Sequence, residues 1–281
     1  MQKRILIIQD ISAIGRVSMG VALPILSSCG VISSMLPTAL LSTHSGGFKD
    51  FSFLDLTEEM HKIVAHWRRE GLAFDAIQTG YLGSSKQVAV VTEALQLAKE
   101  DACIIVDPAM ADNGKLYSKI SEEMVGAMKS LCQHAKIILP NLTEACFLAG
   151  RAYENRYDDP AFIGMLTRDL HDKLGVENII ITGVSRTRNK YGAACYNGIQ
   201  DNLTYFEGDR VEDHFYGTGD IFASVLSAAV QNGKSIEEST EIATEFTAKT
   251  IKMSHEAGLA REYGTCFEKN IPWLVQRLGL L

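Results

Sequence analysis

The chain has 281 residues, of which 46% are hydrophobic and 22% charged, so it can bury a large core and has an ordinary globular composition. Its formal net charge is −7 and its Lys and Arg residues form no basic stripe, which argues against nucleic acid as the main partner. Its six cysteines are widely spaced and include no C-x-x-C pair, which indicates small buried residues in a reducing compartment rather than disulfides or a zinc site.

The beginning of the chain favours a strand, a buried helix and a second strand. The apolar run after MQKR is too short for a signal peptide and is typical of a first strand. Residues 17–48 contain no Asp, Glu, Lys or Arg, but Pro24, Gly30 and Pro37 interrupt them. A membrane span needs about 20 mostly apolar residues in one helix. We therefore expect no membrane partner.

Apolar runs of strand length then alternate with amphipathic stretches of helix length. Strands are predicted at 4–9, 31–36, 74–78, 103–107, 136–140 and 178–182, and helices at 14–28, 55–70, 84–100, 120–133, 142–149 and 158–174. This alternation predicts an α/β fold with a mostly parallel central sheet and helices on both faces.

The last part of the chain breaks this alternation. Residues 190–197 and 202–209 favour an antiparallel hairpin at the sheet edge, and helices are expected at about 217–231 and 235–255. Since the sequence contains no repeat, low-complexity tract or linker, we expect a single domain over residues 1–281.

Polar residues follow every predicted parallel strand, at the edge where ligands bind in open parallel sheets. In strand order they are Asp10 and Ser12; Ser42, Thr43, His44 and Ser45; Thr79 and Tyr81; Asp107; Asn141 and Glu144; and Thr182.

The segment GTGD, residues 217–220, opens the first of the two late helices. The amides of Gly217, Thr218 and Gly219, together with the helix dipole, are suited to binding an anion, and Asp220 can face the same ligand. An anion site with an adjacent base indicates phosphoryl transfer to a hydroxyl group. From this segment alone, an Asp that only stabilises the helix N-terminus is an equal alternative.

Two carboxylates at neighbouring strand ends are candidates for a metal site. Asp107 opens VDPAMADNGKLY after the fourth strand and can hold Mg²⁺ directly or through water, while Asp112 and Asn113 are typical of a turn. Asn141 and Glu144 have capping-box spacing, although Glu144 could also approach Asp107 and share a metal bound to phosphates. For Glu144 both interpretations stay open.

His44 lies in STHSGGF, a charge-free loop with Ser45 and Gly46 that could contact or cover a small ligand. We interpret His44 as a substrate-binding residue rather than a catalytic one. Tyr81 could stack on an aromatic ligand or pack beneath its own loop.

Five segments together resemble a known family: QDISAIGRVS, STH, DPAMADNGKLY, LPNLTEA and GTGD. They are similar to the ribokinase-like superfamily and, within it, to the pyridoxal kinases. The resemblance implies a three-layer fold and ATP-dependent phosphorylation of the 5′-hydroxymethyl group of a B6 vitamer, which is pyridoxal, pyridoxamine or pyridoxine. It also implies Mg²⁺, an assisting monovalent cation such as K⁺, a homodimer and a cytoplasmic location.

The resemblance also implies roles for individual residues. Asp220 would be the base, and the amides of Gly217, Thr218 and Gly219 would stabilise the phosphoryl group. The substrate pocket would be formed by Ser12, Ser45, Gly46 and Tyr81, and Mg²⁺–ATP would be held by Asp107, Glu144, Asn141 and Thr182.

Gly46 and Gly47 stand where familiar members have polar or aromatic residues, which leaves the pocket's selectivity open. A kinase of hydroxymethylpyrimidine or another small alcohol is therefore the first alternative. A non-catalytic vitamer-binding protein is the second.

Overall fold

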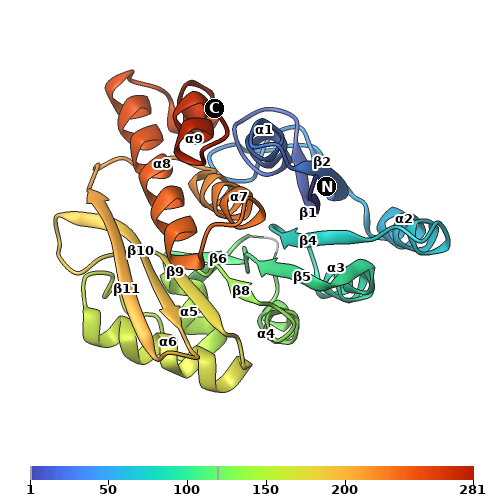
Figure 1. Cartoon of the computed structure of the whole chain (residues 1–281), viewed down its shortest axis with the longest axis horizontal. Helices are drawn as coiled ribbons and strands as arrows, with labels where there is room; N and C mark the ends of the chain where they lie inside the picture. Colours follow the sequence, from blue (N-terminus) through green and yellow to red (C-terminus); the bar gives the residue numbers. More distant parts are fainter. Residues whose placement is uncertain (1, 119) are drawn as a thin grey trace.

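A nine-stranded sheet runs through the centre of the molecule (Figure 1). The computed structural model describes residues 2–118 and 120–281. The strand order is β11-β10-β9-β8-β5-β4-β1-β2-β3. The six inner strands are parallel, whereas β10, β11 and β3 are antiparallel to their neighbours. The mostly parallel sheet and its antiparallel edge hairpin are therefore confirmed.

The strands of this sheet are β1 (Arg4–Ser12), β2 (Ile32–Leu41), β3 (Phe53–Asp55), β4 (Phe74–Thr79), β5 (Ala98–Val106), β8 (Ile137–Ile138), β9 (Asn178–Val184), β10 (Lys190–Asn197) and β11 (Asn202–Asp209). The helices are α1 (Met19–Ser28), α2 (Thr57–Arg69), α3 (Ser85–Ala94), α4 (Glu123–Cys132), α5 (Leu142–Ala149), α6 (Pro160–Leu174), α7 (Thr218–Gln231), α8 (Ile236–Glu256) and α9 (Ile271–Arg277).

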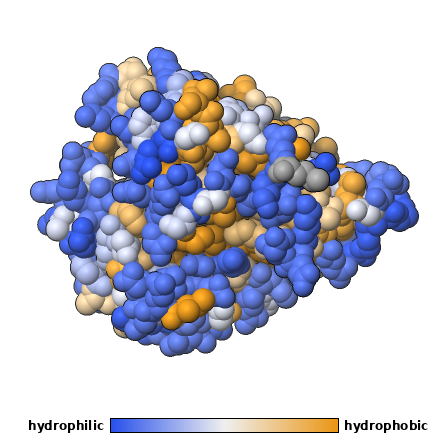
Figure 2. Space-filling view, in the orientation of Figure 1, coloured by the Kyte–Doolittle hydropathy of each residue, from blue (hydrophilic) through white to orange (hydrophobic). Residues whose placement is uncertain are grey.

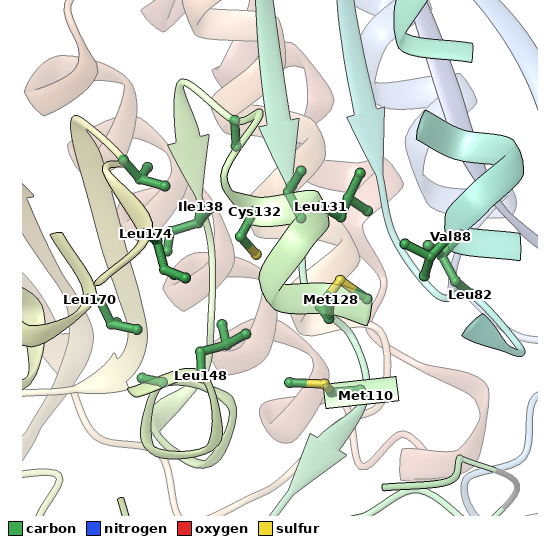
Figure 3. Packing of buried hydrophobic residues seen from close by; sticks show 14 of the residues in the cluster. Leu82, Val88, Met110, Met128, Leu131, Cys132, Ile138, Leu148, Leu170 and Leu174 are labelled. Carbon is green, nitrogen blue, oxygen red and sulfur yellow. The ribbon is translucent and has the colours of Figure 1, made fainter. Parts of the chain in front are cut away.

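Helices cover both faces of the sheet, as predicted. One core cluster joins one face to α2, α3, α4, α5 and α6, and Figure 3 shows side chains of α4, α5 and α6 around Ile138 of β8. A second cluster joins the other face to α1, α7, α8 and α9. Alternate strand residues supply the two clusters, as Leu6 and Ile8 against Ile5 and Ile7 show.

Two predicted helix boundaries were wrong. The helix expected at 14–28 begins only at Met19, because residues 13–17 form a loop at the sheet edge. The helix expected at 84–100 ends at Ala94, and β5 already begins at Ala98. Residues 98–101 include Lys99 and Glu100, which favour helix, but β5 begins at Ala98, which pairs with Phe74 of β4 before the register is interrupted up to Cys103.

Four short elements were not predicted: β3, α9, and the strands β6 (Ala111–Asp112) and β7 (Lys115–Leu116). β6 and β7 form a hairpin whose two turn residues, Asn113 and Gly114, have φ of 50° and 77°, a pair typical of Asn-Gly turns. The turn expected at Asp112 and Asn113 is thus confirmed.

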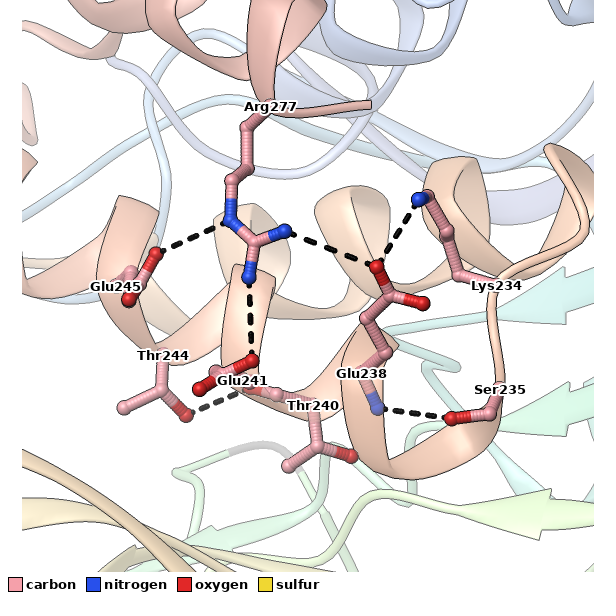
Figure 4. A network of polar contacts seen from close by, with 8 residues as sticks. All are labelled: Lys234, Ser235, Glu238, Thr240, Glu241, Thr244, Glu245 and Arg277. Atoms are coloured by element: carbon pink, nitrogen blue, oxygen red, sulfur yellow. Dashed lines mark hydrogen bonds and ion pairs between the residues drawn. The ribbon is translucent and has the colours of Figure 1, made fainter. Parts of the chain in front are cut away.

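The terminal helix α9 is joined to α8 by ion pairs (Figure 4). The guanidinium group of Arg277 lies 3.7 Å from Glu238, 3.1 Å from Glu241 and 3.6 Å from Glu245. These glutamates lie on one side of α8, since residues three or four apart are neighbours on a helix.

Hydrophilic residues cover most of the face seen in Figure 2, and hydrophobic ones appear in small patches between them. All six cysteines are free and buried, as expected. Among the described residues, no helix combines the length and the hydrophobicity that crossing a bilayer requires.

Candidate active site

The N-terminus of α7 lies at the carboxyl edge of the sheet. Gly217 is the N-cap residue of α7, with φ 80°, and a Cβ atom there would lie 2.1 Å from the carbonyl oxygen of Arg16. Only glycine fits this close approach at a positive φ. A Cβ atom at Gly219 would meet nothing within 4 Å. The first turn of α7 therefore faces open space, where its amides and the helix dipole favour an anion.

Asp220 is the third residue of α7, and its carboxylate turns back towards the start of α1. Its Oδ2 atom accepts a hydrogen bond of 2.8 Å from the amide of Ser18. Burial raises the pKa of Asp220 to about 7, the Ser18 amide lowers it, and the charge of Asp10 raises it. A carboxylate with a pKa near neutrality is suited to general base catalysis.

Asp10 and Ser12 lie at the end of β1, on the other side of Ser18. Asp10 is 4% exposed and accepts hydrogen bonds from the Ser18 hydroxyl (2.6 Å) and from the Ser12 hydroxyl (2.9 Å). Burial raises the pKa of Asp10, while the two hydroxyl groups lower it. The sequence placed Asp10 among the polar residues at the sheet edge, because it follows a buried strand. It assigned no role to Asp10. Ser18 is the last residue of the QDISAIGRVS segment, but the sequence assigned it no role.

Tyr81, after β4, lies beside Asp10. It is partly buried, and its pKa is raised to about 12 by burial and by the charges of Asp10 and Asp55. Asp10, Ser12 and Asp220 are thus linked through Ser18, and Tyr81 lies within electrostatic range of Asp10.

Glu144 has both carboxylate oxygens engaged by backbone amides. The capping box with Asn141 is present: Oε2 accepts from the Asn141 amide at 2.9 Å, and the Glu144 amide donates to the Asn141 side chain at 3.0 Å. Oε1 accepts from the amides of Met110 (3.0 Å) and Ala111 (3.3 Å). Glu144 therefore links α5 to the loop after Asp107, and its carboxylate is occupied by protein contacts.

Asp107 differs from Glu144 because its carboxylate accepts no hydrogen bond from the described residues. It follows β5, two residues after Ile105 of the core beneath α7, so it lies on the α7 face of the sheet. Burial raises its pKa well above the usual value, and the charges of Glu144 and Asp220 raise it further. Asp107 is therefore repelled by two other carboxylates, and none of the three has an ion-pair partner among the described residues.

Asn141 and Thr182 lie next to these carboxylates. Thr182 forms an isolated parallel bridge with Asn141, and its amide donates to the carbonyl oxygen of Pro140 at 2.9 Å. The Asn141 side chain donates to the carbonyl oxygen of Ala111 at 2.8 Å.

His44 anchors the loop that contains Ser45 and Gly46. Its Nδ1 atom lies 3.2 Å from the Gly46 amide, which donates to it, and its Nε2 atom lies 2.6 Å from the carbonyl oxygen of Glu262. The ring is 8% exposed, whereas Ser45 is exposed. Both ring nitrogens are thus engaged within the chain, so only the ring carbons of His44 are left to contact a substrate.

Tyr216, the residue directly before GTGD, packs against this loop. A Cβ atom at Gly46 would lie 2.3 Å from its ring, and the rings of Tyr216 and His44 are 5.0 Å apart. The glycine at this position lets the loop lie against the start of α7. No pattern in the sequence indicated this contact.

Comparisons with known proteins agree with this geometry. The model of the phosphomethylpyrimidine kinase family matches residues 23–265. A crystal structure of a Bacteroides thetaiotaomicron protein assigned as a phosphomethylpyrimidine kinase superposes with a TM-score of 0.92 at 36% identity, over 97% of this chain and 94% of that one. An orthorhombic form of that protein contains pyridoxal. Pyridoxal kinase from Lactobacillus plantarum superposes with a TM-score of 0.90 at 28% identity, over 98% of both chains.

Curated relatives include a pyridoxal kinase of Dictyostelium discoideum, 28% identical over 179 residues that make up 59% of this chain and 55% of that protein. A pyridoxal kinase of Actinobacillus pleuropneumoniae is 27% identical over 193 residues, 66% of this chain and 65% of that protein. The chain spans 50% to 58% of the length of the first three curated relatives. The structural neighbours confirm the expected ribokinase-like fold.

Proposed function

The chain belongs to the family of phosphomethylpyrimidine and pyridoxal kinases, and on this premise we propose that it transfers the γ-phosphoryl group of ATP to the 5′-hydroxymethyl group of a B6 vitamer. The family resemblance inferred from the motifs is thereby confirmed. The observation that carries the proposed reaction is the position of Asp220, a base of near-neutral pKa beside the open first turn of α7. We take residues 1–281 as one catalytic domain.

In this reaction the 5′-hydroxyl oxygen attacks the γ-phosphorus, the bond to the ADP oxygen breaks, and the hydroxyl proton passes to Asp220. The amides of Gly217, Thr218 and Gly219 stabilise the charge on the transferred phosphoryl group. Because Asp220 belongs to the same helical turn, the base and the anion site are held in fixed relation. Proton acceptance by a positioned group contributes about 10²- to 10⁴-fold to the rate.

The vitamer ring lies between Tyr81 and the His44 loop in this proposal. Ser12 is the hydrogen-bonding group for the ring substituents, and Ser45 and Gly46 line the opposite side. The contacts of His44 support a role in holding this loop, with its ring carbons rather than its nitrogens facing the substrate.

The carboxylates around Asp107 fit a bound divalent cation, because Asp107 is partly buried, accepts no hydrogen bond from the described residues and is repelled by Glu144 and Asp220. The described residues contain no cluster of three His, Cys, Asp or Glu side chains in metal-binding geometry, so phosphate oxygens and water would complete the ligand set of Mg²⁺. When bound, Mg²⁺ would neutralise charge on the β- and γ-phosphates.

Within this arrangement Asp107 is the residue that would hold the metal, and Glu144 positions the surrounding loop. Asn141, Thr182 and Gly219 are the further ATP contacts, and K⁺ is the proposed monovalent cation.

We also propose a cytoplasmic homodimer. Support for the dimer comes from exposed apolar side chains on and beside the sheet edge formed by β2 and β3: Ile14, Ile32, Met35, Leu40 and Leu54.

Hydroxymethylpyrimidine is the second candidate substrate. It is favoured by the family model and by the 36% identity to the Bacteroides protein, whereas the pyridoxal in the crystal of that same protein favours a vitamer. Both substrates present a hydroxymethyl group on a nitrogen heterocycle, so Asp220 would act identically on either.

A substrate panel tests the proposal. Pyridoxal, pyridoxamine, pyridoxine and hydroxymethylpyrimidine are each incubated with ATP and Mg²⁺, and ADP and the phosphate ester are quantified. Phosphorylation of at least one vitamer at the highest kcat/KM is expected. If hydroxymethylpyrimidine gives the highest kcat/KM, the second candidate replaces the first, and if no compound is turned over while pyridoxal still binds, the chain is a binding protein.

A further inference from the structure

Ser18 has a backbone conformation that serine rarely adopts. Its φ is 51° and its ψ is −132°, and it is the N-cap residue directly before α1. Residues in such conformations persist only where their surroundings fix them, and they cluster at functional sites. Ser18 is 7% exposed, so its surroundings can fix it closely.

The contacts of Ser18 connect two carboxylates. Its amide donates to Asp220 at 2.8 Å and its hydroxyl donates to Asp10 at 2.6 Å. A serine at an N-cap ordinarily uses its hydroxyl to accept an amide of its own helix, but Ser18 makes no such bond. Its hydroxyl is turned away from α1 to reach Asp10.

Asp10 is in turn held from the other side. The hydroxyl of Ser12 donates to its second oxygen at 2.9 Å. The pairing of β1 with β2 is irregular between Gln9 and Ile11, and irregularities of this kind redirect side chains. A continuous chain of hydrogen bonds therefore runs from Ser12 through Asp10 and Ser18 to Asp220.

Among the described residues, no cationic side chain forms an ion pair with Asp10 or with Asp220. The two carboxylates therefore influence each other without a neutralising charge between them. Asp10 faces His44 and Tyr81, and Asp220 lies within electrostatic range of Asp10, Asp107 and Tyr117. Removing one carboxylate charge therefore changes the proton affinity of the other.

We propose that Asp10 and Ser18 are positioning residues for the phosphoryl transfer: the amide of Ser18 fixes the carboxylate of Asp220, and Asp10 holds the hydroxyl of Ser18 and places a second carboxylate near that base. This inference rests on the proposed function of Asp220 as the base. It adds to the active centre Asp10 and Ser18, two residues of the QDISAIGRVS segment to which the sequence assigned no role.

Three variants test the Ser18 backbone, the Ser18 hydroxyl and the Asp10 charge separately. Ser18→Gly keeps the amide and adopts positive φ without strain, although it loses the bond to Asp10. Ser18→Ala loses the same bond and is strained. Asp10→Asn keeps an acceptor for the Ser18 hydroxyl but removes the charge.

The readouts are kcat, the KM for MgATP and the pH dependence of kcat/KM. Ser18→Gly is expected to keep kcat within about 3-fold of the parent, and Ser18→Ala to lose about 10-fold or more, since small misplacements of a catalytic group are costly. Asp10→Asn is expected to move the acidic limb of the profile down by about 0.5 to 1 pH unit. The KM for MgATP should stay unchanged in all three.

Two results would overturn the inference. One is an Asp10→Asn profile that superimposes on the parent profile, and the other is a loss of kcat in Ser18→Gly as large as in Ser18→Ala.

The parent and Asp220→Asn are assayed first, so that failure of the proposed function is recognised separately. If the parent turns over no substrate, the Asp220 carboxyl carbon is titrated by NMR in the parent and in Asp10→Asn. This experiment tests, without turnover, whether the charge of Asp10 changes the proton affinity of Asp220. Equal titration midpoints would then refute it.

Discussion

Replacing Asp220 by Asn is expected to stabilise the fold while removing catalysis. Asn keeps the shape of the side chain and an oxygen that can accept the Ser18 amide, but it carries no charge. In the folded chain, burial raises the pKa of Asp220 from 3.8 to about 7, so ionisation opposes folding. Active-site groups of this kind commonly trade stability for function.

The gain in folding stability from Asp220→Asn is expected to increase with pH. Because the pKa is raised on folding, protonated Asp220 contributes its full stability below pH 3.8, and this contribution is lost as the pH rises to about 7. Three pH units at about 1.4 kcal/mol each set an upper limit of about 4 kcal/mol. Since water and relaxation reduce such costs, we expect Asp220→Asn to gain about 1 to 3 kcal/mol at pH 8 and little at pH 4.

Thermal unfolding at pH 4, 6 and 8 measures this gain, with about 2–4 °C in Tm for each kcal/mol in a domain of this size. Asp209→Asn is the matched control, because the Asp209 side chain is 93% exposed and its pKa is lowered by Lys190, so its loss should raise Tm at no pH. The kcat of Asp220→Asn should fall by roughly 10² or more. An unchanged Tm at pH 8, or turnover as fast as that of the parent, would refute the assignment of Asp220 as a base whose pKa is raised by desolvation.

Three further substitutions test other contacts. Glu144→Gln places an NH₂ group against backbone amides, so we expect a loss of about 1–3 kcal/mol by thermal unfolding, and an unchanged Tm would contradict its role as an amide acceptor. Gly46→Ala places a Cβ atom 2.3 Å from the Tyr216 ring, so it should raise the KM for the vitamer. The double variant that also carries Tyr216→Ala should reduce this steric effect. Equal KM values for Gly46→Ala and the parent would show that the loop moves freely. Arg277→Ala should lower stability by about 1 kcal/mol at low salt and by less at high salt, because its partners are partly exposed, and a loss independent of salt would point to packing instead.

The helices and strands that contain a strong pattern of apolar residues could be predicted from the sequence. The parallel strands and the helices between them follow from runs such as ILII and NIIIT, whose burial the sheet confirms. β3, β6 and β7 have two or three residues each and no apolar period, so only tertiary pairing defines them. The strand from Ala98 was missed because AKED favours helix locally.

The residues of the candidate site also fall into those that local sequence predicts and those that only tertiary contacts define. Asp220, Asp107 and Asn141 stand next to glycines, prolines or strand ends, so their place at the sheet edge could be inferred. The capping box of Glu144 was one of two open interpretations, and the structure supports it. The place of Ser18 depends on an unusual φ and on partners 8 and 202 residues away, and no local pattern encodes either.

The buried cysteines make the chain suited to site-specific labelling. Burial raises the pKa of Cys29 to about 12 and that of Cys103 and Cys195 to about 11, so these three thiols form almost no reactive thiolate at neutral pH. Cys103 lines a surface pocket and would be the first to react under forcing conditions. A single cysteine introduced at exposed Ser45 would therefore carry a fluorophore against a silent native background, and movement of the His44 loop could be followed in real time as ligands bind.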